Sequence, residues 1–309
     1  MTSVASQTRL ARWWDGDLAY GFRRSPVAIV SALVLAVCLV AALFAPWIAP
    51  HNPFDLATLN LTDALAPPHG MAGARPEYLL GTDDQGRDVL SAIMFGTRIS
   101  LLVGVAAVAL SVMLGVSLGL VSGYGGGRLD AFIMRAADVQ LSFPAILIAL
   151  LIDGVARAVL PRGAHGDVAL VVLIVAIGVS NWPTYARTVR SSTLVEKGKE
   201  YVQAARVIGI TPAAILFRHL LPNVLGPVLV LATINIATAI VLEATLSFLG
   251  VGVPPTRPSL GTLIRVGNDF LFSGEWWITI FPGAALVILV LAINLLGDWL
   301  RDALNPKLK

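Results

Sequence analysis

Long apolar runs without charge dominate this chain and alternate with shorter polar stretches. Five runs carry no Asp, Glu, Lys or Arg over about the 20 residues that a helix needs to cross a hydrocarbon core. They are Ser25–Pro50, Ile99–Gly127, Val168–Ala186, His219–Leu242 and Trp276–Gly297. We therefore predict five transmembrane helices from these runs alone.

A further apolar run, Ala131–Ile152, contains Arg135 and Asp138. Residues three apart lie on one face of a helix, so we predict that these two charges pair near a membrane boundary. With this run counted, the pattern predicts an all-α integral membrane protein with about six transmembrane helices.

The distribution of lysine and arginine predicts the orientation, because these residues concentrate in cytoplasmic loops. If both termini are cytoplasmic, the cytoplasmic segments hold 15 of the 22 Lys and Arg residues. The other 7 are Arg75, Arg87, Arg98, Arg157, Arg162, Arg257 and Arg265. We predict a multi-pass protein of the inner (plasma) membrane with both termini in the cytoplasm. The net charge of +3 is then a topology signal, not a sign of nucleic-acid binding.

Composition agrees with this class, since 56% of residues are hydrophobic and only 13% are charged. Soluble domains have roughly 45–50% and 25%. The single cysteine, Cys38, lies in the first run, and the four histidines are scattered. We therefore expect no disulfide, no metal site and no bound cofactor. The chain also lacks a phosphate-binding loop, because none of its lysines precedes Ser or Thr.

The segment Glu200–Asn223 is basic and amphipathic. One predicted helical stripe is Tyr201, Ala204, Ala205 and Ile208. The other is polar and consists of Lys199, Gln203 and Arg206. Gly209 is placed to end this helix, and Thr211 and Pro212 are placed to start a second one. The apolar stripe of the second helix is Ala213, Leu216, Phe217 and Leu220. From periodicity alone, the first helix either lies on the membrane surface or forms a rigid knob that docks into a partner.

This segment resembles the EAA loop of permease subunits of ABC importers, whose pattern is Glu-Ala-Ala, three residues, Gly, nine residues, then Ile-x-Leu-Pro. Here the alanines follow Glu200 at a distance of four residues, and His219 occupies the Ile position. Either Glu200 or Gln203 takes the acidic contact position. The resemblance implies that coupling to an ATPase is carried by Glu200, Gln203, Ala204, Ala205, Arg206, Gly209, Leu221 and Pro222.

Other stretches are similar to the dipeptide/oligopeptide/nickel permease family, and in arrangement to the C-type permease of a heterodimeric pair. They are Phe44–Phe54, Leu80–Ser91, Gly96–Leu101, Glu243–Pro255 and Phe281–Pro306. The resemblance implies the type I ABC importer transmembrane-domain fold with a cytoplasmic EAA coupling helix. Residues 1–98 are then the cytoplasmic tail, first transmembrane helix and external loop, and residues 99–309 are the permease core with five transmembrane helices.

The resemblance also implies partners. These are a companion permease, two ABC ATPase subunits that hold ATP and Mg²⁺, an external solute-binding protein, and membrane lipid, with no role for nucleic acid. The expected function is a non-catalytic permease for uptake of di- or oligopeptides or related small solutes. The alternative is a self-sufficient ion-coupled carrier, which is expected to show ionisable residues at mid-membrane and an internal repeat.

Two further regions are candidate sites. The external segment His51–Arg98 is either a solvated loop or a surface that packs on the binding protein or companion permease. Its signature residues are Gly81, Thr82, Asp83, Gly86, Arg87 and Asp88.

Glu243 ends an uncharged run, so it either meets substrate in the pathway or stabilises packing at the membrane boundary. Asn235 and Asn294 are expected to bond across helices or to line the pathway.

Overall fold

Five long helices coincide with the five uncharged runs in the computed structural model, which describes residues 17–55, 59–161, 165–254 and 256–304. They are α3 (Pro26–Leu43), α5 (Val89–Gly125), α8 (His165–Glu196), α11 (Leu221–Phe248) and α13 (Trp277–Leu304). Each is long and apolar enough to cross a membrane. The prediction of an all-α membrane protein is confirmed. The tail before Asp17 and the C-terminal residues Lys307 and Lys309 lie outside the described residues.

The third predicted span is not one straight helix. Two helices, α6 (Gly127–Leu141) and α7 (Ala145–Val159), are bent by 94° relative to each other. The break has a local cause, because Phe143 precedes Pro144 and a residue before proline avoids the helical conformation. The predicted pair Arg135–Asp138 is also wrong. The Asp138 carboxylate instead bonds the Arg187 guanidinium of α8.

Helix α5 begins at Val89 instead of Ile99. Asp88 caps it by accepting a hydrogen bond from the backbone N–H of Ser91 at 2.9 Å. The predicted boundary between residues 98 and 99 therefore falls inside α5. The shorter described elements at this end and beside α3 are α2 (Asp17–Arg24), α4 (Ala45–Ile48), η1 (Leu61–Asp63), α12 (Leu260–Asn268) and η4 (Leu271–Ser273).

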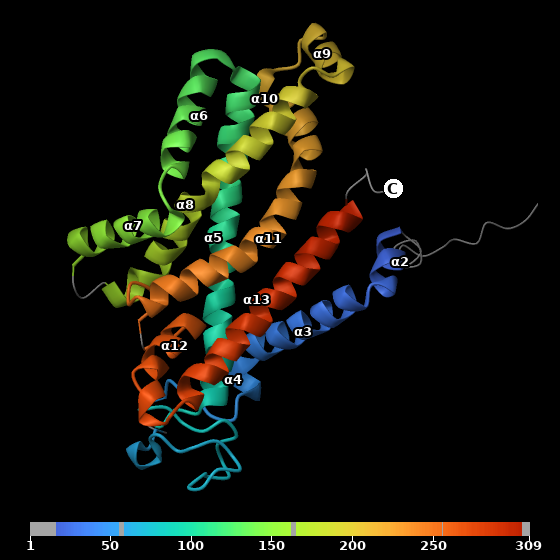
Figure 1. Cartoon of the computed structure of the whole chain (residues 1–309). Coiled ribbons are helices and arrows are strands. Elements are labelled where there is room, and N and C mark those ends of the chain that lie inside the picture. The colour runs from blue at the N-terminus through green and yellow to red at the C-terminus, as the bar shows by residue number, and fades with distance from the viewer. Residues whose placement is uncertain (1–16, 56–58, 162–164, 255, 305–309) are drawn as a thin grey trace, which may run out of the picture.

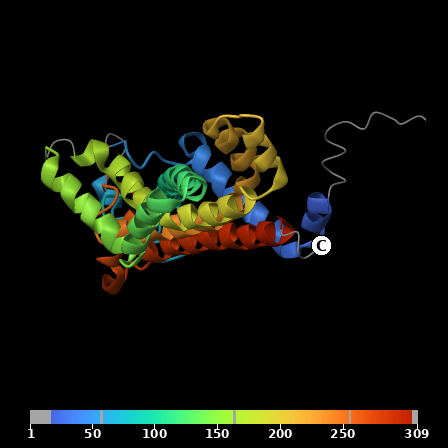
Figure 2. The ribbon, with the colours of Figure 1, turned by 90° about the horizontal axis from the view of Figure 1, so that it is seen from above.

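The two ends of the bundle carry different structures (Figure 1). The short helix α9 (Glu200–Val207) lies beyond the ends of α5, α8 and α11, whereas the segment between α4 and α5 lies with α12 at the opposite end. Seen from above, α7 lies at one side of the molecule and α2 at the other (Figure 2). The face of α3 that carries Val30, Leu33 and Val37 remains exposed, as expected for side chains that face lipid.

A glycine seam holds α5 against α8. A Cβ atom added at Gly115 would lie 2.4 Å from the Tyr185 Cβ, and one at Gly119 would lie 2.6 Å from the Ala186 carbonyl oxygen. A Cβ atom at Gly123 would lie 2.8 Å from the Thr193 Cβ. Small residues spaced by four allow two transmembrane backbones to approach closely, which gives dispersion contacts that lipid cannot replace. The Ser111 hydroxyl strengthens the seam by donating to the Gly178 carbonyl at 2.8 Å.

Candidate functional site

Helix α9 ends in a Schellman motif built on Gly209. The N–H of Ile210 donates to the Ala205 carbonyl at 3.0 Å, and the N–H of Gly209 donates to the Arg206 carbonyl at 3.1 Å. Gly209 has φ +80°, a left-handed conformation that glycine adopts without the steric cost of a Cβ atom. A Cβ atom there would meet nothing within 4 Å, so backbone conformation alone selects glycine.

The face that α9 buries differs from the predicted stripe. Val202 and Ala205 are buried in the main hydrophobic cluster, whereas Tyr201, Ala204 and Ile208 are exposed. Of the predicted apolar stripe, only Ala205 therefore packs inward. A helix of eight residues has only about two turns, so the period of its apolar residues does not define one buried face. Packing against the neighbouring helices decides which face is covered.

A second helix follows as predicted, but it contains a wide turn. Thr211 caps α10 (Pro212–Ala214), its hydroxyl accepting from the Ala214 N–H at 3.4 Å. The π-helical turn η3 (Ile215–Leu220) then leads into α11, and the Leu221 N–H bonds the Leu216 carbonyl five residues back. This turn precedes Pro222, which has no N–H for a bond four residues back.

The predicted stripe of this second helix is only half buried. Leu220 is buried and Leu216 packs against the core, but Ala213 and Phe217 are exposed. Ile215, which the stripe did not include, is buried.

Contacts to three long helices hold α9 in place. The Tyr201 hydroxyl donates to the Glu196 carboxylate of α8 at 2.7 Å and accepts from the Asn223 amide of α11 at 3.2 Å. Partial desolvation of its hydroxyl, and then the Glu196 carboxylate, raise the pKa of Tyr201 to about 12. The Arg206 guanidinium lies 5.2 Å from the centre of the Tyr124 ring at the end of α5.

The two candidates for the acidic contact position differ in their hydrogen bonding. The Gln203 side-chain amide donates to the Lys197 carbonyl at 3.1 Å, within the connection from α8 to α9. Glu200 is exposed in the first turn of α9, and its carboxylate has no hydrogen-bond partner within the described part of the chain. Glu200 is therefore the one whose charge is available to another protein.

Large apolar side chains project outward from this segment. Val207 is 87% exposed, Ile208 74% and Phe217 68%. Val207 and Ile208 end α9 directly before Gly209, and Phe217 lies on η3, which packs against α9. We call Val207, Ile208 and Phe217 the apolar tip. Exposed apolar side chains that gather at one place are typical of a surface that another protein covers.

The signature residues fold the loop between α4 and α5 onto itself. Thr82 and Asp83 are buried, and Asp83 accepts hydrogen bonds from the Arg87 N–H at 2.9 Å and from its guanidinium Nε at 2.6 Å. Asp88 caps α5, and the Trp277 indole N–H donates to the Thr82 carbonyl at 3.1 Å. The carboxyl of Asp84 is not stabilised in this way, and burial together with the neighbouring Asp83 raises its pKa.

Two glycines of the signature are required by close backbone contacts. A Cβ atom at Gly81 would lie 2.5 Å from the Ala66 carbonyl oxygen, and one at Gly86 would lie 2.6 Å from the Asn60 carbonyl oxygen. Both have positive φ. We predicted either a solvated loop or a partner-binding surface, and neither prediction included this burial. The signature side chains hold the loop together, and only the outer surface of the loop is left for a partner.

Glu243 joins three helices. It is fully buried, and it accepts hydrogen bonds from the Ser247 hydroxyl at 2.7 Å and from the Ser100 hydroxyl of α5 at 2.8 Å. The Ser100 hydroxyl also accepts from the Leu260 N–H, the first residue of α12, at 3.3 Å. This geometry supports the structural alternative over substrate contact.

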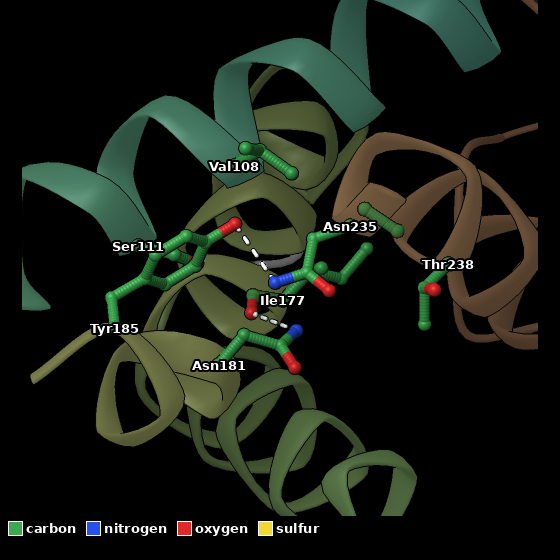
Figure 3. A pocket seen from close by; sticks show the side chains of 8 residues that line it. Val108, Ser111, Ile177, Asn181, Tyr185, Asn235 and Thr238 are labelled. Carbon is green, nitrogen blue, oxygen red and sulfur yellow. Dashed lines mark hydrogen bonds between the residues drawn. The ribbon is translucent and has the colours of Figure 1, made fainter. Parts of the chain in front are cut away.

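Asn235 bonds across helices, which is one of the two roles expected for it. Its amide donates to the Tyr185 hydroxyl of α8 at 2.9 Å (Figure 3). Asn235 also lines a small cavity between α5, α8 and α11. Asn294 is half-buried on α13 and does not line this cavity.

Sequence comparison assigns the chain to a family. Residues 115–309 match the family described as binding-protein-dependent transport system inner membrane component, and residues 13–68 match the N-terminal transmembrane domain of oligopeptide transport permease C. The chain belongs to this permease family. It is 39% identical to the dipeptide transport system permease protein DppC of Haemophilus influenzae, over 99% of this chain and 98% of that protein. It is 42% identical to the DppC protein of Escherichia coli strain K12, over 100% and 97%.

A solved structure supports the fold of the permease. The MetNI methionine ABC transporter, in an inward-facing crystal form, has a chain that matches 69% of this permease and 96% of its own length, with a TM-score of 0.54 and 22% identity. The predicted membership of the ABC importer permeases is confirmed, as is the membrane location. No group of three or more His, Cys, Asp or Glu that could hold a metal ion occurs among the described residues of the permease.

Some functional candidates in the permease were not predicted from the sequence. The apolar tip includes Val207, which no stripe contained, and Asp153 of α7 is a buried carboxylate paired with Arg157. The spacing of four residues between Asp153 and Arg157 was the available signal for this pair. No sequence signal identified the apolar tip, because apolar residues on a short helix are equally consistent with a buried face.

Proposed function

We propose that this chain is one of two permease subunits of an ATP-driven importer, and that α9 with its Gly209 turn transmits movement from partner ATPases. The observation that carries the proposal is the apolar tip, held rigidly by the Schellman motif and by the contacts of Tyr201 and Arg206. A surface helix resting in lipid headgroups needs no such fixed geometry. A knob that receives force from another protein does.

The contact surface on α9 is mixed in chemistry. The apolar tip supplies apolar area, the small Ala204 allows close approach, and Glu200 offers an unpaired carboxylate. We assign the acidic contact position to Glu200, since the side chain of Gln203 is bonded to the Lys197 carbonyl. Gly209, Leu221 and Pro222 shape the turn and the start of α11, and Arg206 supports α9 from behind through Tyr124.

The transported solutes are peptides, by analogy with the dipeptide and oligopeptide permeases that the chain resembles in sequence. A companion permease forms the other half of the pathway, and an external binding protein delivers the peptide. With α9 in the cytoplasm, the termini are cytoplasmic and the folded loop between α4 and α5 faces outward. Asn235 and Asn294 are candidate pathway residues, and the ATPases, not this chain, hold ATP and Mg²⁺.

A charge placed in the apolar tip tests this proposal. Ile208→Glu should leave the chain folded, because the Ile208 side chain contacts mainly solvent, yet it should abolish copurification of the ATPases and ATP-dependent uptake. Phe272→Glu is the matched control, since Phe272 is 95% exposed at the opposite end of the bundle. Gly209→Val should have a similar but weaker effect, through roughly 1–2 kcal/mol of backbone strain.

Arg206→Ala should do less than either change, because exposed charges contribute only about 0–1 kcal/mol. If Ile208→Glu keeps full ATPase binding and uptake, α9 is not the coupling element. The resemblance to importer permeases would then be the only support for the proposal.

A further inference from the structure

Four polar side chains line one small cavity between α8 and α11. Asn181 and Tyr185 lie one turn apart on α8, and Asn235 and Thr238 lie one turn apart on α11 (Figure 3). At 1.5 Å per residue, Asn235 is about 20 Å from the external end of α11, which is near the middle of a bilayer. We call Asn181, Tyr185, Asn235 and Thr238 the midplane cluster.

The internal hydrogen bonds of the midplane cluster leave acceptors free. The Asn235 amide donates to the Tyr185 hydroxyl at 2.9 Å, and the Asn181 amide donates to the carbonyl of Ile177 in its own helix at 3.1 Å. Within the described residues, the side-chain oxygens of Asn181, Asn235 and Thr238 have no hydrogen-bond donor. These oxygens therefore have unused hydrogen-bonding capacity.

The free groups are accessible. Thr238 is exposed, Asn181 and Asn235 are half-buried, and only Tyr185 is fully buried behind them. The cavity between them is about 10 Å³, which is room for about one water molecule. Unsatisfied polar groups facing hydrocarbon are costly, so this face opens onto water or protein and not onto lipid.

The midplane cluster carries no ionised side chain. Amides and hydroxyls offer both donors and acceptors at fixed positions, which matches a neutral group that also has both. A peptide bond is such a group, with one N–H and one C=O. A contact made by neutral hydrogen bonds is weak enough to release what it binds, as passage through a pathway requires.

We propose that the midplane cluster binds the backbone peptide group of the transported solute as it crosses the membrane. The side-chain oxygens of Asn181 and Asn235 share the single peptide N–H as a bifurcated hydrogen bond, and the Thr238 hydroxyl donates to the peptide C=O. Tyr185 is a positioning residue that holds the Asn235 amide. This inference rests on the proposed import of peptides, and it names the chemical group that the pathway contacts.

The test compares a dipeptide with its ester analogue, in which oxygen replaces the peptide N–H. Proteoliposomes would contain the complete transporter, with each substrate held at saturation of the binding protein. Thr238→Val and Asn181→Leu should each lower the dipeptide uptake rate about threefold to tenfold, the effect of one lost neutral hydrogen bond. In Asn181→Leu, ester uptake should fall much less, because the ester has no N–H to lose, so the dipeptide-to-ester ratio falls toward one. In Thr238→Val, both rates should fall, because the ester keeps the C=O that Thr238 binds.

Thr245→Val is the matched control, since the Thr245 hydroxyl bonds only the Val241 carbonyl of its own helix in the described structure. It should leave both rates unchanged. Equal losses for dipeptide and ester in Asn181→Leu, or no loss in either variant, would overturn the inference, as would loss of the companion permease from the complex with Asn181→Leu. If the wild-type transporter shows no ATP-dependent dipeptide uptake, the proposed function itself fails, and the inference with it.

Discussion

The Tyr201 hydroxyl donates a 2.7 Å hydrogen bond to the Glu196 carboxylate, and this bond joins α9 to the last turn of α8. The pKa of Tyr201 is raised to about 12, so the folded state favours the protonated phenol. The stabilisation is thus fully present below pH 10 and is lost only as pH rises through about 12. The bond is intact throughout the physiological range.

Removing this bond should loosen α9 without unfolding the bundle. Tyr201→Phe should speed amide hydrogen exchange in α9 about twofold to tenfold, since a net hydrogen bond contributes about 0.5–1.5 kcal/mol. Exchange in α5 should not change. Tyr20→Phe removes a hydroxyl from α2 and serves as the control. Unchanged exchange in Tyr201→Phe would mean that Val202 and Ala205 alone hold α9.

The burial of Glu243 predicts a defect in stability that does not depend on substrate charge. Glu243→Leu leaves the hydroxyls of Ser100 and Ser247 without their acceptor, which should cost about 2–6 kcal/mol in unfolding free energy. Thermal unfolding in detergent measures this, with Thr245→Val as the control on the same helix. Uptake of cationic and neutral peptides should fall alike. A selective loss for cationic peptides at unchanged stability would place Glu243 in the pathway.

The seam between α5 and α8 should tolerate no added side chain. In Gly119→Ala, the new Cβ atom would lie 2.6 Å from the Ala186 carbonyl oxygen and 2.8 Å from the Val189 Cβ. Overpacking of this kind costs about 1–3 kcal/mol, measurable as a lower unfolding temperature. Gly154→Ala on α7 is the matched control, because its Cβ atom meets nothing within 4 Å. It should be neutral or slightly stabilising.

Orientation can be tested with single cysteines. With Cys38 replaced by Ala, Thr62→Cys on the external loop should react with a membrane-impermeant thiol reagent in intact cells. Gln203→Cys on α9 should react only in opened or inverted vesicles. Both positions are exposed, so neither result would reflect burial. The opposite labelling pattern would reverse the assignment of both termini.

The sequence was sufficient to predict the elements that are marked by a long apolar run. A run of about 20 uncharged residues has few structural alternatives, so all five predicted spans are present as helices. The Gly209 turn and the Thr211 cap were also predictable, because each depends on the conformation of one residue. The break at Pro144 was missed even though its cause is local, because the apolar pattern continues on both sides.

Features that depend on packing were beyond the sequence. The stripe of α9 was misplaced because a helix of two turns has too few residues to define its buried face. Asp138 was assigned to the nearest charge along the chain, whereas its partner Arg187 lies on another helix. The proximity of Asn235 to Asn181 and Tyr185 could not be predicted, because it depends on how α8 and α11 are rotated relative to each other, and neither helix sequence specifies that rotation alone.

The glycine seam has a mechanical consequence. Two backbones in direct contact cannot rotate or slide past each other without steric clash, so α5 and α8 behave as one rigid unit. The Lys197 ammonium joins the two helices at the end that leads into α9 by donating to the Gly123 carbonyl at 2.8 Å. Because α8 leads directly into α9, a displacement of α9 moves α5 and α8 together. Relative movement within the permease then occurs at the contacts of α5 and α8 with the other helices, not along the seam.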